Sequence, residues 1–321
     1  MTVPLVKEPD SIRIAMIGMV EDDNHPYSWS AILNGYDPEA MDSCPASVIP
    51  RYLAAQPREN FGIAGARVTH IWCDKAAAAR HVARAALIPE IVDHPAAVIG
   101  KVDAVIIPTD IGSEHLERAR PFVEAGLPVL IDKPLTDSED HLREFVRWHR
   151  QGRAIVSSSA LRYSAEFAGC LRRLDSIGEL RLATITTCRS WERYGIHAAE
   201  GVYAFLSPGA WQSVVNTGSR TANIVHARHQ GCVDVVLAAI EDMDGALGCL
   251  NLYGTRGSLS SQFRDSFTAF KAQLAAFIRY LQTGCRPYPF EETVELTKII
   301  IAGIRSREES NRRVMLSEIA V

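Results

Sequence analysis

The first half of the chain alternates short apolar runs with longer stretches of helical periodicity. The apolar runs predict buried strands at residues 12–17, 68–74, 102–110, 129–132 and 154–157. Helices are predicted between them, one beginning near residues 26–28 and others at about 75–87, 113–125 and 138–151. This alternation requires a parallel sheet with helices on both faces. Residues 1–157 are therefore predicted to form an α/β domain, interrupted by a proline-rich insertion at 35–66 in which only 48–55 is expected to be helical.

The second half has a different pattern, because its apolar runs follow one another with few helices between them. Strands are predicted at residues 180–187, 214–216, 223–229, 233–240 and 246–252, with a last one at 314–316. Such a succession is typical of an antiparallel sheet. Helices are expected at about 267–282 and 291–307. Residues 158–321 are therefore predicted to be an α+β domain with an open, mainly antiparallel sheet.

The composition restricts the class of function. The chain has 321 residues, which is enough for two hydrophobic cores, and its 47% hydrophobic and 22% charged residues are ordinary for a globular protein. Its net charge of -4 argues against nucleic acid or an anionic membrane as partner and favours a small neutral or anionic ligand. There is no signal-peptide pattern and no apolar run near the roughly 20 residues of a membrane helix. The seven scattered cysteines lack a C-x-x-C pair, so we expect a protein of the reducing cytoplasm without a disulfide framework.

The end of the first predicted strand is typical of a turn that opens a dinucleotide-binding unit. Gly18 follows the strand directly, and Met19 and Val20 come next. The full G-x-G-x-x-G pattern is absent, however, and acidic residues stand at 21–23, where a diphosphate favours N–H donors. A glycine that serves only a tight turn is the alternative.

Asp74 is a candidate ligand for a cofactor ribose, because it closes the second predicted strand. An acid there can accept hydrogen bonds from both ribose hydroxyls and repels a 2′-phosphate, which favours NAD over NADP. The insertion lengthens the usual spacing of about 20 residues, so spacing adds no support. The alternative is an N-cap for the helix that follows.

The segment around Lys133 is the strongest candidate for chemistry. The strand at 129–132 runs into Asp132, Lys133 and Pro134, and ligands of α/β proteins bind at the carboxyl ends of such strands. Pro134 restricts its own backbone and that of Lys133, which limits where the ammonium group can point. A solvated lysine at a strand end is the alternative.

No metal site is predicted. His226 and His229 lie on opposite faces of one predicted strand, so core or surface roles are favoured over metal binding. Residues 22–25 (Asp-Asp-Asn-His) offer ligand atoms without the spacing of a calcium loop, and a solvated turn is expected. Trp191 could stack on a sugar, although packing is the commoner role of a tryptophan.

The order of these motifs resembles the glucose-fructose oxidoreductase / inositol dehydrogenase family (Gfo/Idh/MocA) over nearly the whole chain. Residues 102–109 look like the family strand that ends in Ala-Thr-Pro, and His115 stands where members carry a histidine. Residues 125–135 are similar to the Ala-Gly-Lys-His-Val-Leu-Cys-Glu-Lys-Pro segment. Arg162 with the tyrosine after it, and Ile-Gly-Glu-Leu at 177–180, match the entry to the second domain.

The resemblance implies a Rossmann domain that holds NAD(P) and a second domain whose sheet supports the substrate and a contact in a homodimer or homotetramer. It implies that Lys133 lies near the nicotinamide and that His197 is the catalytic acid or base. The cofactor contacts expected from the turn, the strand ends and the resemblance are Gly18, Met19, Val20, Asp74, Thr109, His115, Asp132, Lys133 and Arg162.

Arg193 is a departure from the family pattern, which has an aspartate four residues before the histidine. Side chains at i and i+4 share a helix face, so an arginine there opposes protonation of His197. It could instead bind a substrate carboxylate. Glu200 could replace the missing aspartate as the group that orients His197, and Tyr194 could contribute a hydroxyl.

The function predicted from the sequence is an NAD-dependent dehydrogenase of a sugar, polyol or sugar acid. Hydride transfer from a carbinol carbon needs a base for the hydroxyl proton and a cation for the developing alkoxide, and Lys133 and His197 can divide these roles. One alternative is a catalytically silent binding or regulatory protein of the same fold. The other is a lyase or epimerase that retains NAD.

Overall fold

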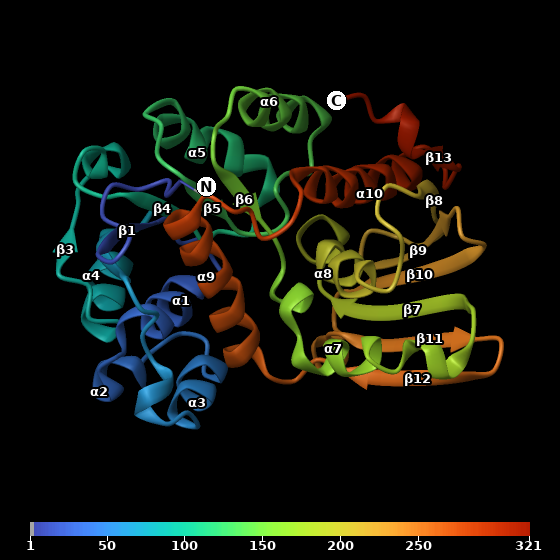
Figure 1. Ribbon diagram of the computed structural model, residues 1–321, viewed down its shortest axis with the longest axis horizontal. Coiled ribbons are helices and arrows are strands. Elements are labelled where there is room, and N and C mark those ends of the chain that lie inside the picture. Colours follow the sequence, from blue (N-terminus) through green and yellow to red (C-terminus); the bar gives the residue numbers. More distant parts are fainter. Residues whose placement is uncertain (1–2) are drawn as a thin grey trace.

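The computed structural model describes residues 3–321 and folds them into two lobes, each built on one sheet (Figure 1). The first sheet has the strand order β3-β2-β1-β4-β5-β6, and all its pairings are parallel. Its strands are β1 (Ile12–Ile17), β2 (Ala66–Trp72), β3 (Glu90–Ile91), β4 (Ala104–Ile107), β5 (Val129–Ile131) and β6 (Ile155–Ser157). The predicted parallel sheet is confirmed, and only β3 was missed, because two exposed residues are too few to form an apolar run.

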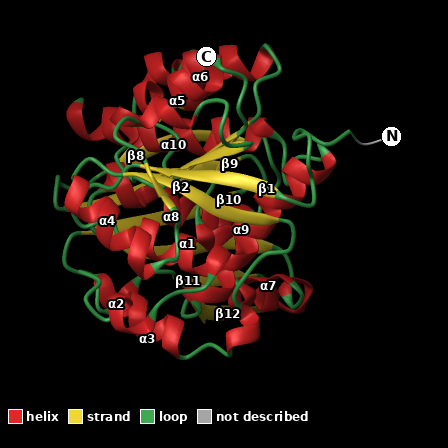
Figure 2. Cartoon of the chain, turned by 90° about the vertical axis from the view of Figure 1, so that its left-hand side faces the viewer, coloured by secondary structure: helices red, strands yellow, loops and turns green. Residues whose placement is uncertain are grey.

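Helices cover both faces of this sheet. They are α1 (His25–Asn34), α4 (Ala76–Ala85), α5 (His115–Glu124) and α6 (Glu139–Arg150), as the sequence predicts to within a few residues. Figure 2 shows α5 and α6 above the strands and α1 below them. The insertion contains α2 (Pro38–Met41) as well as the expected α3 (Val48–Ala54), because Asp37 caps α2 by accepting a hydrogen bond from the Ala40 N–H.

The second lobe is a seven-stranded sheet of order β12-β11-β7-β10-β9-β8-β13. Its strands are β7 (Leu180–Cys188), β8 (Trp211–Asn216), β9 (Ala222–His229), β10 (Val233–Ile240), β11 (Cys249–Gly254), β12 (Gly257–Gln262) and β13 (Val314–Met315). All pairings are antiparallel except β7 with β10, which confirms a mainly antiparallel sheet. Strand β12 was missed because its serine-rich sequence has little apolar character. The expected contact between copies through this sheet stays a prediction.

The helices of the second half are α7 (Ala165–Leu171), α8 (Trp191–Tyr203), α9 (Ser266–Thr283) and α10 (Phe290–Glu308). None of the helices within residues 3–321 is long and apolar enough to cross a membrane.

Helix α9 returns from the second half of the chain to the first lobe, where it lies beside α1 (Figure 1). Its Leu274 and Phe277 belong to the same buried cluster as Ile14 of β1 and Ile32 of α1. The first sheet is therefore covered on one face partly by residues far beyond 157. The domain boundary between residues 157 and 158 stays a prediction.

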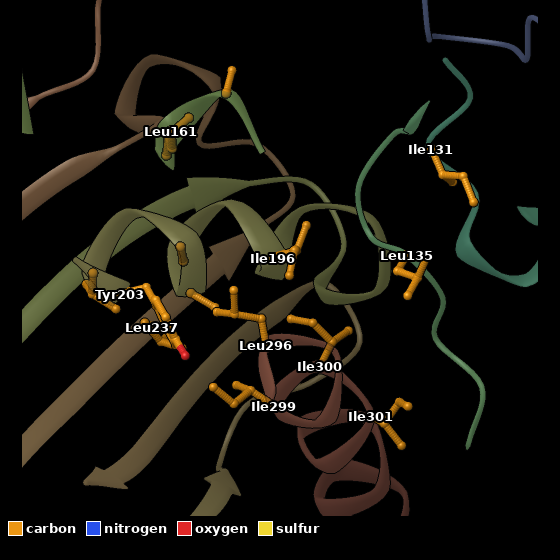
Figure 3. Packing of buried hydrophobic residues seen from close by; sticks show 14 of the residues in the cluster. Ile131, Leu135, Leu161, Ile196, Tyr203, Leu237, Leu296, Ile299, Ile300 and Ile301 are labelled. Atoms are coloured by element: carbon orange, nitrogen blue, oxygen red, sulfur yellow. The ribbon is translucent and has the colours of Figure 1, made fainter. Parts of the chain in front are cut away.

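A second apolar cluster joins the two lobes. It contains Ile131 of β5, Leu237 of β10 and, from α10, Leu296, Ile299 and Ile300 (Figure 3). Complete burial of such a side chain stabilises the fold by roughly 1.5–3 kcal/mol. Because the cluster is continuous across the seam, it fixes the carboxyl end of β5 relative to α8.

Candidate active site

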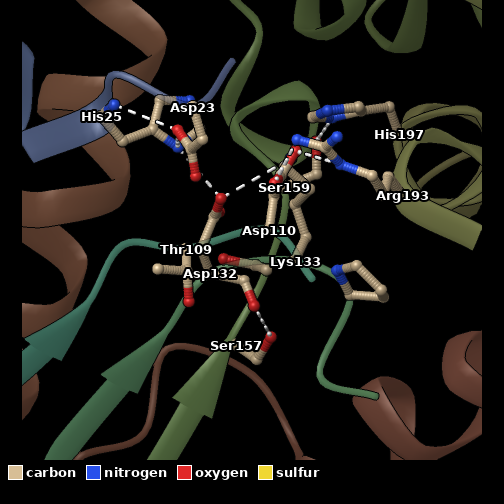
Figure 4. Close-up of polar contacts among 12 residues, drawn as sticks. Asp23, His25, Thr109, Asp110, Asp132, Lys133, Ser157, Ser159, Arg193 and His197 are labelled. Carbon is tan, nitrogen blue, oxygen red and sulfur yellow. Dashed lines mark hydrogen bonds and ion pairs between the residues drawn. The ribbon is translucent and has the colours of Figure 1, made fainter. Parts of the chain in front are cut away.

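Lys133 lies at the carboxyl end of β5, at the seam between the lobes (Figure 4). Its side chain is only 2% exposed, and its Nζ lies 3.5 Å from Asp110 Oδ2 and 3.6 Å from Asp132 Oδ2. Burial opposes the charge of the ammonium group, but the two carboxylates outweigh it and raise the pKa of Lys133. Lys133 is therefore a fixed positive charge at neutral pH.

His115 holds the segment that follows Lys133. Its imidazole is fully buried, with Nε2 2.7 Å from the carbonyl oxygen of Thr109 and Nδ1 2.8 Å from that of Pro134. The ring thus ties the end of β4 to the turn after β5. The structure gives His115 a positioning role, and cofactor contact by this residue stays a prediction.

Helix α8 presents the second group of candidate residues, and Trp191 fixes its rotation. The Trp191 side chain is buried, and its Nε1–H donates to the carbonyl oxygen of Ile300 at 2.9 Å. A Cβ at Gly195 or at Gly303 would lie within 2.5 Å of the indole, so both close approaches require glycine. Trp191 is a packing residue and not a sugar platform.

His197 lies on the face of α8 that is turned toward Lys133 (Figure 4). Its Nδ1 is 2.6 Å from the Ser159 Oγ, which also accepts a hydrogen bond from the Leu161 N–H. Burial, reinforced by the charges of Lys133 and His25, lowers the pKa of His197 well below its ordinary value. The imidazole is therefore neutral at neutral pH, and Nε2 is the nitrogen left for a ligand.

Tyr194 contacts both candidate catalytic residues. Lys133 Nζ lies 4.8 Å from the centre of the phenol ring, and the imidazole of His197 lies 4.9 Å from it, edge to face. The structure thus brings together the amine and the imidazole that the sequence placed on different domains. Ser159, which holds the imidazole, was missed, because a hydroxyl in a serine run carries no signal of its partner.

Arg193 points into the same centre, where Asp110 binds its guanidinium. The two groups form two parallel hydrogen bonds of 2.7 and 3.1 Å. Lys133 and Arg193 outweigh the effect of burial and lower the pKa of Asp110, which stays ionised. The arginine is therefore already paired, with a carboxylate from the segment that follows β4.

Glu200 reaches His197 only indirectly, because it accepts a hydrogen bond of 3.4 Å from the N–H of Ser159, and direct orientation of His197 stays a prediction. Its carboxylate pairs with Arg162 at 2.5 Å, and Arg162 also binds Glu292 at 2.6 Å. The guanidinium of Arg162 lies 4.3 Å from the ring centre of Tyr288. These contacts make Arg162 and Glu200 a buried link between α8 and α10, so cofactor contact by Arg162 stays a prediction.

The glycine turn packs closely against the residues that follow β4 and against α5. Gly18 has a φ of +104°, and a Cβ there would lie 2.9 Å from Thr109 Cγ2 and 3.2 Å from Arg118 Nη1. The Met19 N–H donates to Asp74 at 3.1 Å, and Arg118 binds the same carboxylate at 2.8 and 3.2 Å. Asp74 is one-third exposed, so a free lone pair remains for a ribose hydroxyl.

Two hollows open beside this centre. One, of about 480 Å³, lies over the glycine turn and includes Met19, Val20 and Lys75 in its lining. The other, of about 540 Å³, is lined by charged residues of both lobes, among them Arg193. Asp22 and Arg189 border both hollows, and Lys133 and His197 line neither. The first hollow adjoins the glycine turn, where cofactor contact stays a prediction, whereas the amine and imidazole lie beneath a closed surface.

Comparison with known proteins supports the assignment of the fold. Residues 46–159 match the family described as "Oxidoreductase family, NAD-binding Rossmann fold", a match that begins after the glycine turn. No curated protein sequence matches the chain. The structure is similar to scyllo-inositol dehydrogenase from Lactobacillus casei with bound NAD(H) and scyllo-inositol, with a TM-score of 0.73, 13% identity, and coverage of 96% of this chain and 99% of that one.

Two further solved structures show the same likeness. A myo-inositol dehydrogenase from Corynebacterium glutamicum has a TM-score of 0.71 and 18% identity, covering 95% of this chain and 99% of that one. A probable dehydrogenase from Thermotoga maritima has a TM-score of 0.71 and 14% identity, covering 96% and 100%. At such identities the likeness establishes the fold, and the substrate has to be argued from the residues of this chain.

Proposed function

We propose, for a chain whose Rossmann domain belongs to the Gfo/Idh/MocA oxidoreductase family, that the protein transfers a hydride between a nicotinamide cofactor and a hydroxyl-bearing carbon of a sugar, polyol or sugar acid. The observation that carries this proposal is the pair of groups on Tyr194. A permanently charged amine and a neutral imidazole contact one phenol ring, at the carboxyl end of a parallel sheet.

The two groups suit the oxidation of a carbinol. Loss of a hydride leaves a proton on the substrate oxygen, and the nicotinamide, when bound, accepts the hydride. In the proposed mechanism His197 accepts the proton through Nε2 while Ser159 holds Nδ1. The Lys133 ammonium group stabilises the negative charge that develops on the same oxygen. Asp110 and Asp132 hold the amine in place.

Access to this centre requires a local opening. The Arg189 guanidinium lies 5.0 Å from the ring centre of Tyr194, and its Nη1 lies 3.5 Å from the carbonyl oxygen of Asp22. Asp22 and Arg189 line both hollows, so in the proposed open state their displacement joins the hollows and gives a path past Tyr194 to Lys133 and His197. The contact between Asp22 and Arg189 is therefore a feature of the closed state of the proposed site.

The proposal is tested by binding first and turnover second. Titration of the purified protein with NADH, followed by nicotinamide fluorescence, should saturate in the micromolar to millimolar range. Turnover is then measured with scyllo-inositol and myo-inositol as neutral cyclic polyols and with gluconate and glucuronate as sugar acids. Absence of NADH and NADPH binding at millimolar concentration would exclude the dehydrogenase, whereas substrate consumption without net NADH formation would indicate an NAD-retaining lyase or epimerase.

Asp74→Ala should weaken NADH binding roughly tenfold and reduce the preference for NADH over NADPH. The variant loses a charged acceptor for the ribose hydroxyls and the repulsion of a 2′-phosphate. Fluorescence titration with both cofactors measures the effect. Because Arg118 also binds Glu114, the control is Glu114→Ala, which disturbs the arginine and spares the ribose acceptor. An equal effect of the two variants would contradict the role of Asp74.

The oxidation rate should be independent of the protonation of His197 between about pH 6 and 8. An imidazole with an ordinary pKa near 6.5 would increase the rate several-fold across this interval as it loses its proton. Burial and the Lys133 charge keep His197 neutral throughout, so the base is available even at the lower limit. Initial rates of NADH formation at constant ionic strength measure the profile, and a rise centred near pH 6.5 would contradict this assignment.

A further inference from the structure

Three ligand-type side chains meet beside Lys133, and the hydride-transfer proposal uses none of them as ligands. The Nδ1 of His25 lies 3.0 Å from Asp132 Oδ2 and 3.3 Å from Asp23 Oδ1. One donor atom from each of these three residues lies within 4.8 Å of the other two (Figure 4). His25 begins α1, Asp23 precedes it in the glycine turn, and Asp132 follows β5.

This cluster is buried, which corrects the solvated turn expected from sequence. Asp23 is 4% exposed and Asp132 is 1% exposed. The imidazole of His25 stacks on Trp29 at 4.9 Å between ring centres and meets the edge of Phe270 at 5.2 Å. The cover comes from α1 and from α9 at the other end of the chain, so the local sequence contains no sign of it.

Hydrogen bonds within the protein leave the cluster incomplete. Asp23 Oδ2 is a buried oxygen without a hydrogen-bond partner among the described residues. A proton on His25 Nδ1 forms one hydrogen bond, to Asp132, and leaves this oxygen unpaired. A buried carboxylate oxygen without a partner is costly, and a cation that binds both oxygens of Asp23 removes that cost.

The charges of the surrounding residues are compatible with a cation. Asp110 binds the guanidinium of Arg193 and lies 3.5 Å from Lys133, so it offsets much of the positive charge on that side. Asp23 and Asp132 then remain as two carboxylates beside a single imidazole. Three carboxylates and two fixed cations leave one negative charge in a buried place. Burial opposes a proton on His25, but Asp23 and Asp132 outweigh it and raise the pKa of the imidazole, so this proton balances the charge in the metal-free protein, and a bound cation would displace it.

We propose that Asp23, His25 and Asp132 form a binding site for a divalent first-row transition-metal ion. Ligand atoms about 2.0–2.2 Å from such an ion lie roughly 3.0 Å apart in an octahedron and roughly 3.4 Å apart in a tetrahedron. The separations of 3.0 and 3.3 Å from His25 Nδ1 correspond to adjacent ligands in these geometries. One imidazole and two carboxylates suit manganese, iron or zinc better than calcium, which takes six to eight oxygen ligands.

The test is a titration of the chelator-treated, full-length protein with Mn²⁺, in which electron paramagnetic resonance measures the free ion. Mn²⁺ is chosen because thiolates select zinc, and Cys232 and Cys285 are exposed free cysteines. The wild type should bind one ion per chain in the micromolar range or tighter. His25→Gln and the isosteric Asp23→Asn should each weaken binding at least tenfold, as is typical for loss of a metal-binding partner.

The matched control is His226→Gln. His226 and Asp234 form a histidine–carboxylate pair of 2.7 Å on an exposed part of the second sheet, and its loss should leave Mn²⁺ binding unchanged. The site is disproved if the wild type binds no stoichiometric Mn²⁺, or if both variants bind it as the wild type does. NADH titration of the metal-free protein is a separate measurement, so failure of this site and failure of the dehydrogenase proposal are distinguishable.

Discussion

Replacing Lys133 by Met is expected to lower turnover by at least about 10²-fold, because the variant loses the positive charge that stabilises the developing alkoxide. The NADH dissociation constant should change much less, since the amine acts on the substrate oxygen. Lys133 is 2% exposed and lies between two carboxylates, so the substitution also leaves buried negative charge unpaired. Turnover and cofactor affinity are therefore measured together with thermal melting.

Lys133→Arg separates the chemical role from the structural one. It keeps the charge between Asp110 and Asp132 and should retain the fold, but the longer, planar guanidinium places its charge differently. Turnover should stay at least about tenfold below that of the wild type. The control is Lys101→Met at an exposed position in the same lobe. Wild-type turnover in Lys133→Met would exclude the residue from the reaction.

Loss of the ion pair between Asp110 and Arg193 is expected to have the second large effect, which is a decrease in the stability of the fold. Asp110→Asn should lower the free energy of unfolding by about 3 kcal/mol, because Arg193 then lacks its carboxylate and the buried Lys133 keeps only Asp132. Arg193→Gln should cost about 2 kcal/mol, since the arginine side chain is partly exposed. The double variant should lose less than the sum of the two, with a coupling of about 1–3 kcal/mol.

Urea denaturation at pH 7 measures this cycle. This pH is well above the pKa of roughly 3.9 that an aspartate has in the unfolded chain. Because the folded pKa of Asp110 is depressed, its stabilising pairs are complete at that pH and are lost only as the pH falls through the folded value. The control cycle uses Arg13 and Asp103, which form a similar two-bonded pair on the surface. Exposed pairs contribute at most about 1 kcal/mol. Additive losses at Asp110 and Arg193 would show that they do not act as a unit.

The sequence predicted well the residues whose location follows from a local apolar pattern or from the order of motifs along the chain. An apolar strand that ends in Asp132-Lys133-Pro134 indicated an amine at the edge of a parallel sheet, and the structure has Lys133 there. The order of motifs along the chain placed His197 on a helix of the other lobe. Both predictions depend on local pattern and chain order, which a single sequence displays directly.

The positions that the sequence missed are those decided by contacts between distant segments. Asp110 received no role, although an arginine in place of the expected aspartate on α8 implies a carboxylate elsewhere in the centre. Asp23 was interpreted as part of a solvated turn because the spacing of a calcium loop is absent, but its side chain is buried although Asp22 beside it is exposed. Helical spacing assigned Glu200 to His197 and gave no sign of its ion pair with Arg162.

Because α9 packs against the first lobe, residues 1–157 alone do not contain the complete hydrophobic core of that lobe. Leu274 and Phe277 complete the apolar layer beneath β1, and they reach it only after the chain has built most of the other lobe. A fragment that stops at residue 157 would display that layer to solvent and be prone to aggregate. Exchange of one lobe between relatives, by recombination or in the laboratory, therefore has to carry this helix along with residues 1–157.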